Sequence, residues 1–328
     1  MSDARIAVLV VTYNRIALLR ECVDAVLGQT HAASALYIVD NHSEDGTAEY
    51  LEELACQHED DTCHPERRAK PGAEGSLPPV RVITSDKNLG GAGGFELGVR
   101  TALSEGSDFG WLVLIDDDAI LAPDFLEKMA AGVDAHPKVR LFAGAVKCRD
   151  NIDTNHRRRI KNRLIFSEEW VPEREYATGS FFCDMATFCG LMISREMMEE
   201  AGAPRGDYFI WYDDTEYCLR CGRVAAGRGY EERILVLPEA VTDHRSQPVE
   251  AGGDILMRTD WRSRYGWANR YDVARRYLGA LTAFTVKCEY RILRLKSRIM
   301  ALSSDEKIRG QGQFNVKMIG EVFDAIGR

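Results

Sequence analysis

Three consecutive carboxylates, Asp116, Asp117 and Asp118, directly follow the apolar run Trp111–Ile115. Such a run is typical of a buried strand, and three adjacent anions at its end repel one another. Because carboxylate oxygens are preferred ligands of Mg²⁺, we interpret the triplet as a divalent-metal site that holds a phosphate-bearing substrate. Alternate residues of an extended segment point the same way, so Asp116 and Asp118 are expected to share the ion. The alternative is a solvated turn before the helix that follows Pro123.

A second acidic pair, Asp213 and Asp214, stands beside aromatic residues. Aromatic rings offer flat apolar faces to a sugar ring. A carboxylate partly desolvated among Trp211 and Tyr212 has a raised pKa, as a general base near neutral pH requires. The alternative is an ordinary helix start, with Asp213 as the N-cap residue and Glu216 as its capping-box partner.

Four predicted strands alternate with helical segments in the first part of the chain: Ile6–Val11, Ala35–Val39, Val80–Thr84 and Trp111–Ile115. This alternation predicts an α/β fold with a mostly parallel, Rossmann-like sheet flanked by helices. In open sheets of this kind, ligands bind beyond the carboxyl ends of the strands. A polar cluster follows each predicted strand: Thr12–Arg15, Asp40–Ser43, Asn88–Gly94 and Asp116–Asp118.

The segment Asn88–Gly94 carries four glycines before a helix that we expect from about Phe95 to Leu103. Glycine lets a backbone approach a ligand, and N–H groups at a helix start bind phosphate, so the segment indicates a phosphate-binding turn. The alternative is a tight connection with the helix packed close to the sheet. Arg15 could pair with a diphosphate and Asp40 could accept hydrogen bonds from a nucleoside, although both also suit ordinary surface and turn roles.

The second half of the chain is less regular. Its expected strands and helices are Leu141–Lys147, Phe188–Ile193, Arg195–Ala201, Asp213–Ala226 and Ile234–Leu237, with a loop or hairpin at Asn151–Trp170. His244 closes a further strand-like segment. A lone histidine is usually a surface residue, but one at a strand end could be a third metal ligand.

The bulk composition is that of an ordinary globular protein of 328 residues with a net charge of −9, which disfavours nucleic acid as a partner. Nine cysteines without paired spacing favour reduced thiols. No apolar run reaches the length of a membrane span, and no secretory signal opens the chain, so we expect a cytoplasmic protein. We expect the stretch His58–Pro79 to be an exposed insertion.

A change in composition near Thr259 suggests two regions, a catalytic domain over 1–258 and a basic helical region over 259–328. Between Arg258 and Arg309 the chain holds 13 basic and five acidic residues. Residues 259–311 could lie on the inner face of the cytoplasmic membrane as a peripheral contact. They could equally pack against the catalytic domain or against a second subunit in a homo-oligomer.

Taken together, these motifs resemble those of glycosyltransferase family 2, over roughly Ile6–Arg245. The resemblance rests on Val10–Arg15, Val39–Thr47, Asn88–Gly94, Asp116–Asp118 and Trp211–Tyr217, which stand in the family's order. The closest likeness is to its galactofuranosyltransferase branch, with rhamnosyltransferases as neighbours. The resemblance implies a GT-A fold, a nucleotide-sugar donor, Mn²⁺ or Mg²⁺, and an inverting mechanism. The acceptor would be a hydroxyl of a cell-surface glycan or a lipid-linked saccharide.

The same resemblance implies roles for individual residues. Asp214 would be the general base, and Asp116, Asp118 and His244 would engage the metal. The donor-binding set would be Thr12, Asn14, Arg15, Asp40, Asn88, Gly90, Gly91, Gly93, Gly94 and Asp117. The acceptor-binding set would be Trp211, Tyr212, Asp213 and Glu216.

UDP-galactofuranose is the expected donor, with dTDP-rhamnose as the alternative. Two functions of other classes stay open. A nucleotidyltransferase also combines glycines with metal carboxylates, but its glycines and a basic residue usually follow the first strand, where Thr12–Arg15 stands here. A non-catalytic carbohydrate-binding protein would not need Asp116, Asp118 and Asp214 together.

Overall fold

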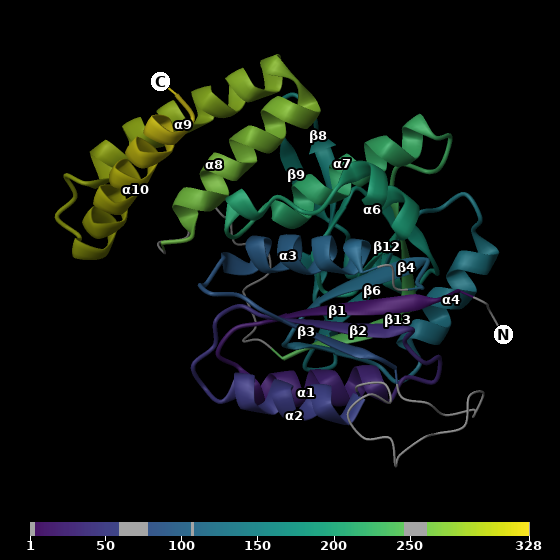
Figure 1. Ribbon diagram of the computed structural model, residues 1–328. Helices are drawn as coiled ribbons and strands as arrows, with labels where there is room; N and C mark the ends of the chain where they lie inside the picture. The colour runs from purple at the N-terminus through teal and green to yellow at the C-terminus, as the bar shows by residue number, and fades with distance from the viewer. Residues whose placement is uncertain (1–3, 59–77, 106–107, 246–260, 328) are drawn as a thin grey trace, which may run out of the picture.

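The computed structural model describes residues 4–58, 78–105, 108–245 and 261–327. A central ten-stranded sheet lies between two layers of helices, and a three-stranded sheet and a group of C-terminal helices stand to one side (Figure 1). The expected α/β architecture with a helical C-terminal region is confirmed. Apart from its ends, the predicted insertion His58–Pro79 lies outside the described residues.

The parallel half of the sheet consists of the four strands predicted from the sequence. In spatial order they are β3 (Val80–Thr84), β2 (Ala35–Asp40), β1 (Ile6–Thr12) and β4 (Trp111–Asp116). They pair in register, with Thr12 opposite Asp40 and Val11 opposite Asp116. The polar clusters after β1, β2 and β4 therefore meet at one edge of the sheet.

Every residue of β1 is buried, because helices cover both faces of the sheet. Its alternate side chains enter two different cores. Leu9 packs with Phe95 of α3 (Gly90–Ser104) on one face. Val10 packs with Leu19 of α1 (Ile16–Leu27) on the other, which α2 (Thr47–His58) and α4 (Phe125–Ala135) also cover.

The second half of the sheet is mixed. Strand β12 (Leu191–Ser194) runs antiparallel between β4 and β6 (Leu141–Cys148), and β13 (Ile234–His244) runs parallel to β6. The remaining strands of this sheet are β5 (Ala119–Leu121), β7 (Asn151–Ile152) and β10 (Phe181–Cys183).

Two strand predictions need correction. The strand expected to end at Leu237 continues to His244 through a bulge between Leu237 and Val241. The strand expected from Phe188 begins at Leu191, because Gly190 adopts a φ of +80° that breaks the extended run.

The polar stretch Asn151–Trp170 contains the hairpin that the sequence allowed. Its strands β8 (Arg157–Asn162) and β9 (Ser167–Trp170) pair antiparallel, and β11 (Met185–Ala186) completes the smaller sheet. The short helices nearby are η2 (Thr154–His156), α5 (Glu173–Tyr176), α6 (Arg195–Ala201) and η3 (Gly206–Tyr208). The longer helix α7 (Asp213–Gly227) packs on the sheet face that α3 covers.

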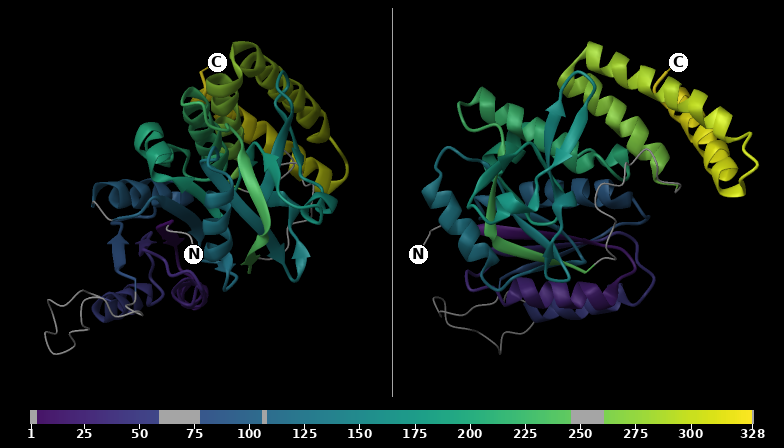
Figure 2. Two further views of the ribbon diagram at one scale, coloured as in Figure 1. Left: turned by 90° about the vertical axis from the view of Figure 1, so that its right-hand side faces the viewer. Right: turned by 180° about the vertical axis from the view of Figure 1, so that it is seen from behind.

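The C-terminal helices are α8 (Ser263–Val273), the π-helical turn η5 (Ala274–Leu278), α9 (Ala280–Met300) and α10 (Glu306–Ala325). They form a third core around Trp267 and Tyr290, which also takes in Tyr212 from the loop before α7. Figure 2 shows α9 and α10 projecting from the body of the molecule. Within the described residues, no helix is both long and apolar enough to cross a bilayer.

Candidate active site

Asp118 and His244 are brought together by strand pairing. His244 lies opposite Ala119 in the β5–β13 ladder, and the backbone N–H of Arg245 donates to the carbonyl of Asp118 at 2.8 Å. The Nε2 of His244 is 3.4 Å from Oδ1 of Asp118. Burial alone would raise the pKa of Asp118, but the hydrogen bond and charge of His244 and the charge of Arg15 lower it. Asp118 is therefore an ionised carboxylate beside an imidazole.

Asp117 faces β1 and its following loop. Its carboxylate accepts hydrogen bonds from Thr12 Oγ1 at 2.8 Å and from Arg15 at 3.0 Å. The same Arg15 nitrogen donates to Asp118 at 2.6 Å. The structure thus joins two residues of the expected donor-binding set, Thr12 and Arg15, to the triplet, and Arg15 already has two carboxylate partners there.

Asp116, the last residue of β4, is surrounded by like charges. Burial, followed by the charges of Asp118 and Asp117, raises its pKa well above the ordinary value, and Asp213 adds to the effect. Asp213, the first residue of α7, is thus near enough to Asp116 for its charge to act on that carboxyl. A divalent cation would offset the repulsion among these groups.

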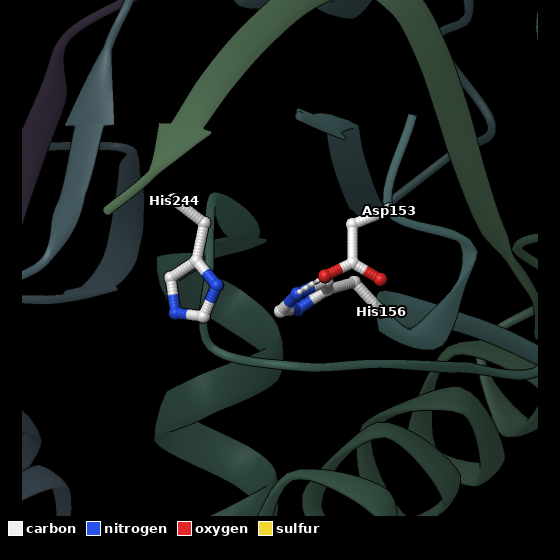
Figure 3. Close-up of side chains that lie close together, drawn as sticks. All are labelled: Asp153, His156 and His244. Carbon is white, nitrogen blue, oxygen red and sulfur yellow. Dashed lines mark ion pairs between the residues drawn. The ribbon is translucent and has the colours of Figure 1, made fainter. Parts of the chain in front are cut away.

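Asp153, His156 and His244 form a second group of metal-ligand type, whose ligand atoms all lie within 4.8 Å of one another (Figure 3). His156 is held on both ring nitrogens, by Thr187 at 2.7 Å and by Asp153 at 3.3 Å. Burial lowers the pKa of His156 to about 4, so its imidazole is neutral near pH 7, as metal ligation requires. Asp153 and His156 were not predicted from the sequence, although their spacing of three residues was a visible signal.

The loop before α7 has an unusual backbone. Phe209, Trp211 and Tyr212 all have φ between 61° and 66°, a region that bulky residues rarely adopt. Asn269 of α8 holds this loop, because its Nδ2 donates to the carbonyls of Tyr208, Ile210 and Trp211 at 2.8–3.2 Å. A residue of the C-terminal helices thus positions the loop that leads to Asp213.

Asn269→Ala should loosen this loop. We expect a loss of about 1–3 kcal/mol in the free energy of unfolding, because buried carbonyls lose their donor, together with reduced transfer. Urea unfolding and turnover, measured beside the exposed-site control Gln57→Ala, would check this. A variant as stable and active as the control would show that Asn269 does not hold the loop in its conformation.

At the start of α7, Asp213 is buried and Asp214 is partly buried. Burial, followed by the charge of Asp214, raises the pKa of Asp213 to about 8. Burial also raises the pKa of Asp214, but Arg158 of β8, 3.7 Å away, and hydrogen bonds from Thr215 oppose the shift. The two environments favour a proton on Asp213 and a negative charge on Asp214. No role for Arg158 was predicted from the sequence.

The capping-box interpretation of this helix start is wrong. Tyr212 is the N-cap residue and Asp213 is already helical. The Glu216 carboxylate is 1% exposed and is engaged by Arg220 at 2.9 Å and by the hydroxyl of Tyr277. Tyr212 packs its ring in the third core, 6.2 Å from that of Phe166. The side chains of Glu216 and Tyr212 are therefore packed inside the protein, whereas Trp211 stays partly exposed.

The glycine-rich segment is the first part of a helix, since α3 begins at Gly90 rather than near Phe95. A Cβ on Gly90 would lie 2.1 Å from the carbonyl oxygen of Phe209, and one on Gly94 would lie 2.5 Å from Cγ1 of Val11. A Cβ on Gly93 would lie 2.5 Å from that of Leu89. These three glycines are explained by close packing, the alternative left open by the sequence.

Gly91 differs from its neighbours, because a Cβ there would meet nothing within 4 Å. Alanine substitutions at Gly91 and Gly94 can therefore be compared directly. Gly94→Ala should destabilise the protein by about 1–3 kcal/mol through overpacking against β1. Gly91→Ala should be neutral or stabilise it by up to ~1 kcal/mol, since alanine favours helix. Equal unfolding midpoints for the two variants would contradict the packing explanation.

Hydrogen bonds connect the loops after β1, β2 and β3. Asn14 accepts from the N–H of Glu44 at 2.7 Å, and Asp40 accepts from the N–H of Ser43 at 2.9 Å. Asn41, another residue without an assigned role, bonds both to Asn88 at 3.3 Å and to the carbonyl of Gly90 at 3.0 Å. The expected donor-binding loops thus form one continuous rim beside the acidic triplet.

Comparison with known proteins agrees with this geometry. The chain is 33% identical over 224 residues to galactofuranosyltransferase GlfT1 of Mycolicibacterium smegmatis, covering 66% of this chain and 65% of that protein. It is 26% identical over 150 residues to dTDP-rhamnosyl transferase RfbF of Shigella flexneri, covering 43% and 46%. The chain thus spans between about half and about two thirds of the length of these curated relatives.

The solved structure of GalNAc-T7 with UDP, GalNAc and Mn²⁺ matches 98% of this chain and 56% of its own, with a TM-score of 0.58 and 13% identity. This likeness shows that the two proteins share the GT-A fold. The model of the family described as Glycosyl transferase family 2 matches residues 7–202. The chain belongs to glycosyl transferase family 2.

Proposed function

We propose that the protein is an inverting glycosyltransferase that moves a sugar from a nucleotide-sugar donor to an acceptor hydroxyl. The observation that carries this proposal is the acidic triplet at the carboxyl end of β4, where Asp118 contacts His244 and Asp117 contacts Arg15. Asp213 of the second acidic pair is near enough for its charge to raise the pKa of Asp116. A non-catalytic carbohydrate-binding protein would have no use for both groups. Membership of the family favours sugar transfer over nucleotidyl transfer.

The residues present fit a divalent cation. Asp118 and His244 offer an oxygen and a nitrogen in contact, and Asp116 lies among anions that a cation would stabilise. These three residues would hold Mn²⁺ or Mg²⁺, with Asp153 and His156 beside His244. When bound, the ion neutralises charge on the diphosphate leaving group. Mn²⁺ accompanies UDP in the GalNAc-T7 structure.

In this proposal Asp214 is the general base. It removes the proton of the acceptor hydroxyl while that oxygen attacks the anomeric carbon from the side opposite the diphosphate. The bond from the anomeric carbon to the diphosphate breaks, and the configuration inverts. Arg158 keeps Asp214 ionised, as a base must be, while Asp213 holds the proton that the pair shares.

The preferred donor in this proposal is UDP-galactofuranose, supported by the likeness to GlfT1. The likeness to RfbF supports dTDP-rhamnose as the second candidate. Thermal shift or saturation-transfer NMR with Mn²⁺ would compare these two donors with UDP-galactopyranose and UDP-glucose. Selective, metal-dependent binding of dTDP-rhamnose would move the protein to the second candidate, and binding of none of the four would overturn the donor class. The proposed acceptor is a surface glycan or lipid-linked saccharide, met at the cytoplasmic face of the membrane.

The pH dependence of transfer tests the role of Arg158. Removing its positive charge in Arg158→Gln should raise the pKa of Asp214, because the anion loses its stabilising partner. The acid limb of the kcat/KM profile should then move to higher pH, so that activity is lost near neutrality and recovers as pH rises. Arg158→Lys, which keeps the charge, should shift the limb less. An unmoved limb in a folded Arg158→Gln variant would contradict this role.

A further inference from the structure

Helix α9 carries an exposed apolar stripe. Five large side chains along it are each 57–67% exposed: Leu281, Phe284, Ile292, Leu295 and Ile299. With 3.6 residues per turn, all five fall within an arc of about 80°. Leu302, just beyond the helix, continues the line and is 86% exposed. A stripe this long and regular is unusual on a solvent-facing helix.

A segment distant in sequence extends the stripe. The tip of the β8–β9 hairpin lies against α9, because Thr282 and Thr285 donate hydroxyl hydrogen bonds to the carbonyls of Arg163 and Leu164. Leu164 and its neighbour Ile165 are 48% and 49% exposed. We call the combined surface the apolar ridge, made of Leu164, Ile165, Leu281, Phe284, Ile292, Leu295, Ile299 and Leu302.

Basic side chains follow one edge of the apolar ridge. Between α9 and α10 they line a hollow of about 570 Å³. Its charged lining is Arg291, Arg294, Arg298 and one acid, Asp324, and its apolar lining includes Leu295 and Phe323. The buried Nε of Arg294 has no hydrogen-bond partner among the described residues. Three guanidinium groups against one carboxylate leave the hollow with excess positive charge, and Leu295 and Phe323 add apolar contact, which suits an anionic head on a hydrocarbon chain.

We propose that the apolar ridge and the arginine-lined hollow dock on a bilayer containing anionic lipids. Helices with an apolar face and basic flanks lie in the plane of the interface, with the apolar side chains at the boundary between headgroups and acyl chains. The hollow takes a lipid phosphate, to which guanidinium groups donate paired hydrogen bonds. This inference goes beyond sugar transfer and does not depend on the donor.

The charge of α9 favours lipid over a second copy of this chain. The helix carries five basic residues and one acidic residue, Glu289. Glu289 is already paired with Arg270 of α8 at 2.9 Å. Two α9 helices packed ridge to ridge would place basic edges beside one another, which costs free energy, whereas an anionic surface attracts each basic residue.

The position of the helix agrees with this role. The α9–α10 pair projects from the body of the molecule (Figure 2). The stripe residues of α9 are exposed to solvent. With five basic residues in 21, α9 is suited to lie on a bilayer rather than to cross it.

Flotation of the full chain with vesicles tests the proposal. The wild type should float with vesicles of equimolar phosphatidylcholine and phosphatidylglycerol, and not with phosphatidylcholine alone. Ile292→Gln/Leu295→Gln/Ile299→Gln should weaken partitioning by at least about 100-fold through the lost apolar contact. Arg291→Gln/Arg298→Gln should weaken it about 30-fold.

The matched control is Arg100→Gln/Lys138→Gln, which removes the same charge from exposed sites outside this surface and should float as the wild type does. Circular dichroism and donor binding confirm that each variant is folded. Equal flotation with both kinds of vesicle, or equal loss in the control, would overturn anionic recognition at this site. The proposal would be overturned if the wild type did not float but formed a dimer by light scattering, and if the triple variant abolished that dimer. The apolar ridge would then be assigned to a second copy of the chain.

Discussion

Asp214→Asn should reduce kcat for sugar transfer by between about 10² and 10⁴-fold, the range expected for loss of a general base. The amide has nearly the shape of the carboxylate but takes no proton from the acceptor hydroxyl. Donor affinity should change little, because Asp214 lies on the α7 side of the site, paired with Arg158 rather than with the triplet. Turnover and donor binding by calorimetry would be measured on the same preparation.

The neighbouring acid supplies the control. Asp213→Asn keeps a neutral group where the structure favours a protonated carboxyl, so its effect on kcat should be much smaller. If Asp213→Asn were the more damaging change, the two roles would have to be exchanged. Wild-type turnover in Asp214→Asn would remove this carboxylate from the mechanism altogether.

Asp118→Ala should abolish metal-dependent donor binding. The substitution removes the carboxylate that contacts His244 and accepts a hydrogen bond from Arg15. Without it, the proposed site loses one of its three metal ligands. Mn²⁺ binding, followed by paramagnetic resonance or calorimetry, should fall below detection, and UDP should no longer bind more tightly when Mn²⁺ is added.

Asp153→Ala separates the two overlapping ligand groups that share His244. With the ion held by Asp116, Asp118 and His244, Asp153→Ala should weaken Mn²⁺ binding by about 10–100-fold at most, the effect of losing a residue beside a ligand rather than the ligand itself. Complete loss in Asp153→Ala, with binding retained in Asp118→Ala, would place the ion among Asp153, His156 and His244 instead.

The parallel half of the fold was predictable because it depends on local patterns. Continuous apolar runs such as Ile6–Val11 mark strands covered on both faces, and the clusters that follow them must meet at one edge. Thr12, Asp40 and Asp117 accordingly lie where the sequence placed them. The start of α3 was misplaced, because glycine propensity suggested a turn where packing against Val11 and Phe209 holds a helix.

The sequence by itself determined which residue types stand at the strand ends, and therefore the fold class and the acidic triplet. Only the tertiary structure decided which acids have cationic or imidazole partners. Arg158 comes to Asp214 from another sheet, His244 comes to Asp118 through the β5–β13 ladder, and Asn269 reaches the loop before α7 from the C-terminal helices. Each of these contacts joins residues that are distant in the sequence. Local propensity carries no information about such pairings, because burial and charge compensation arise only when the chain has folded.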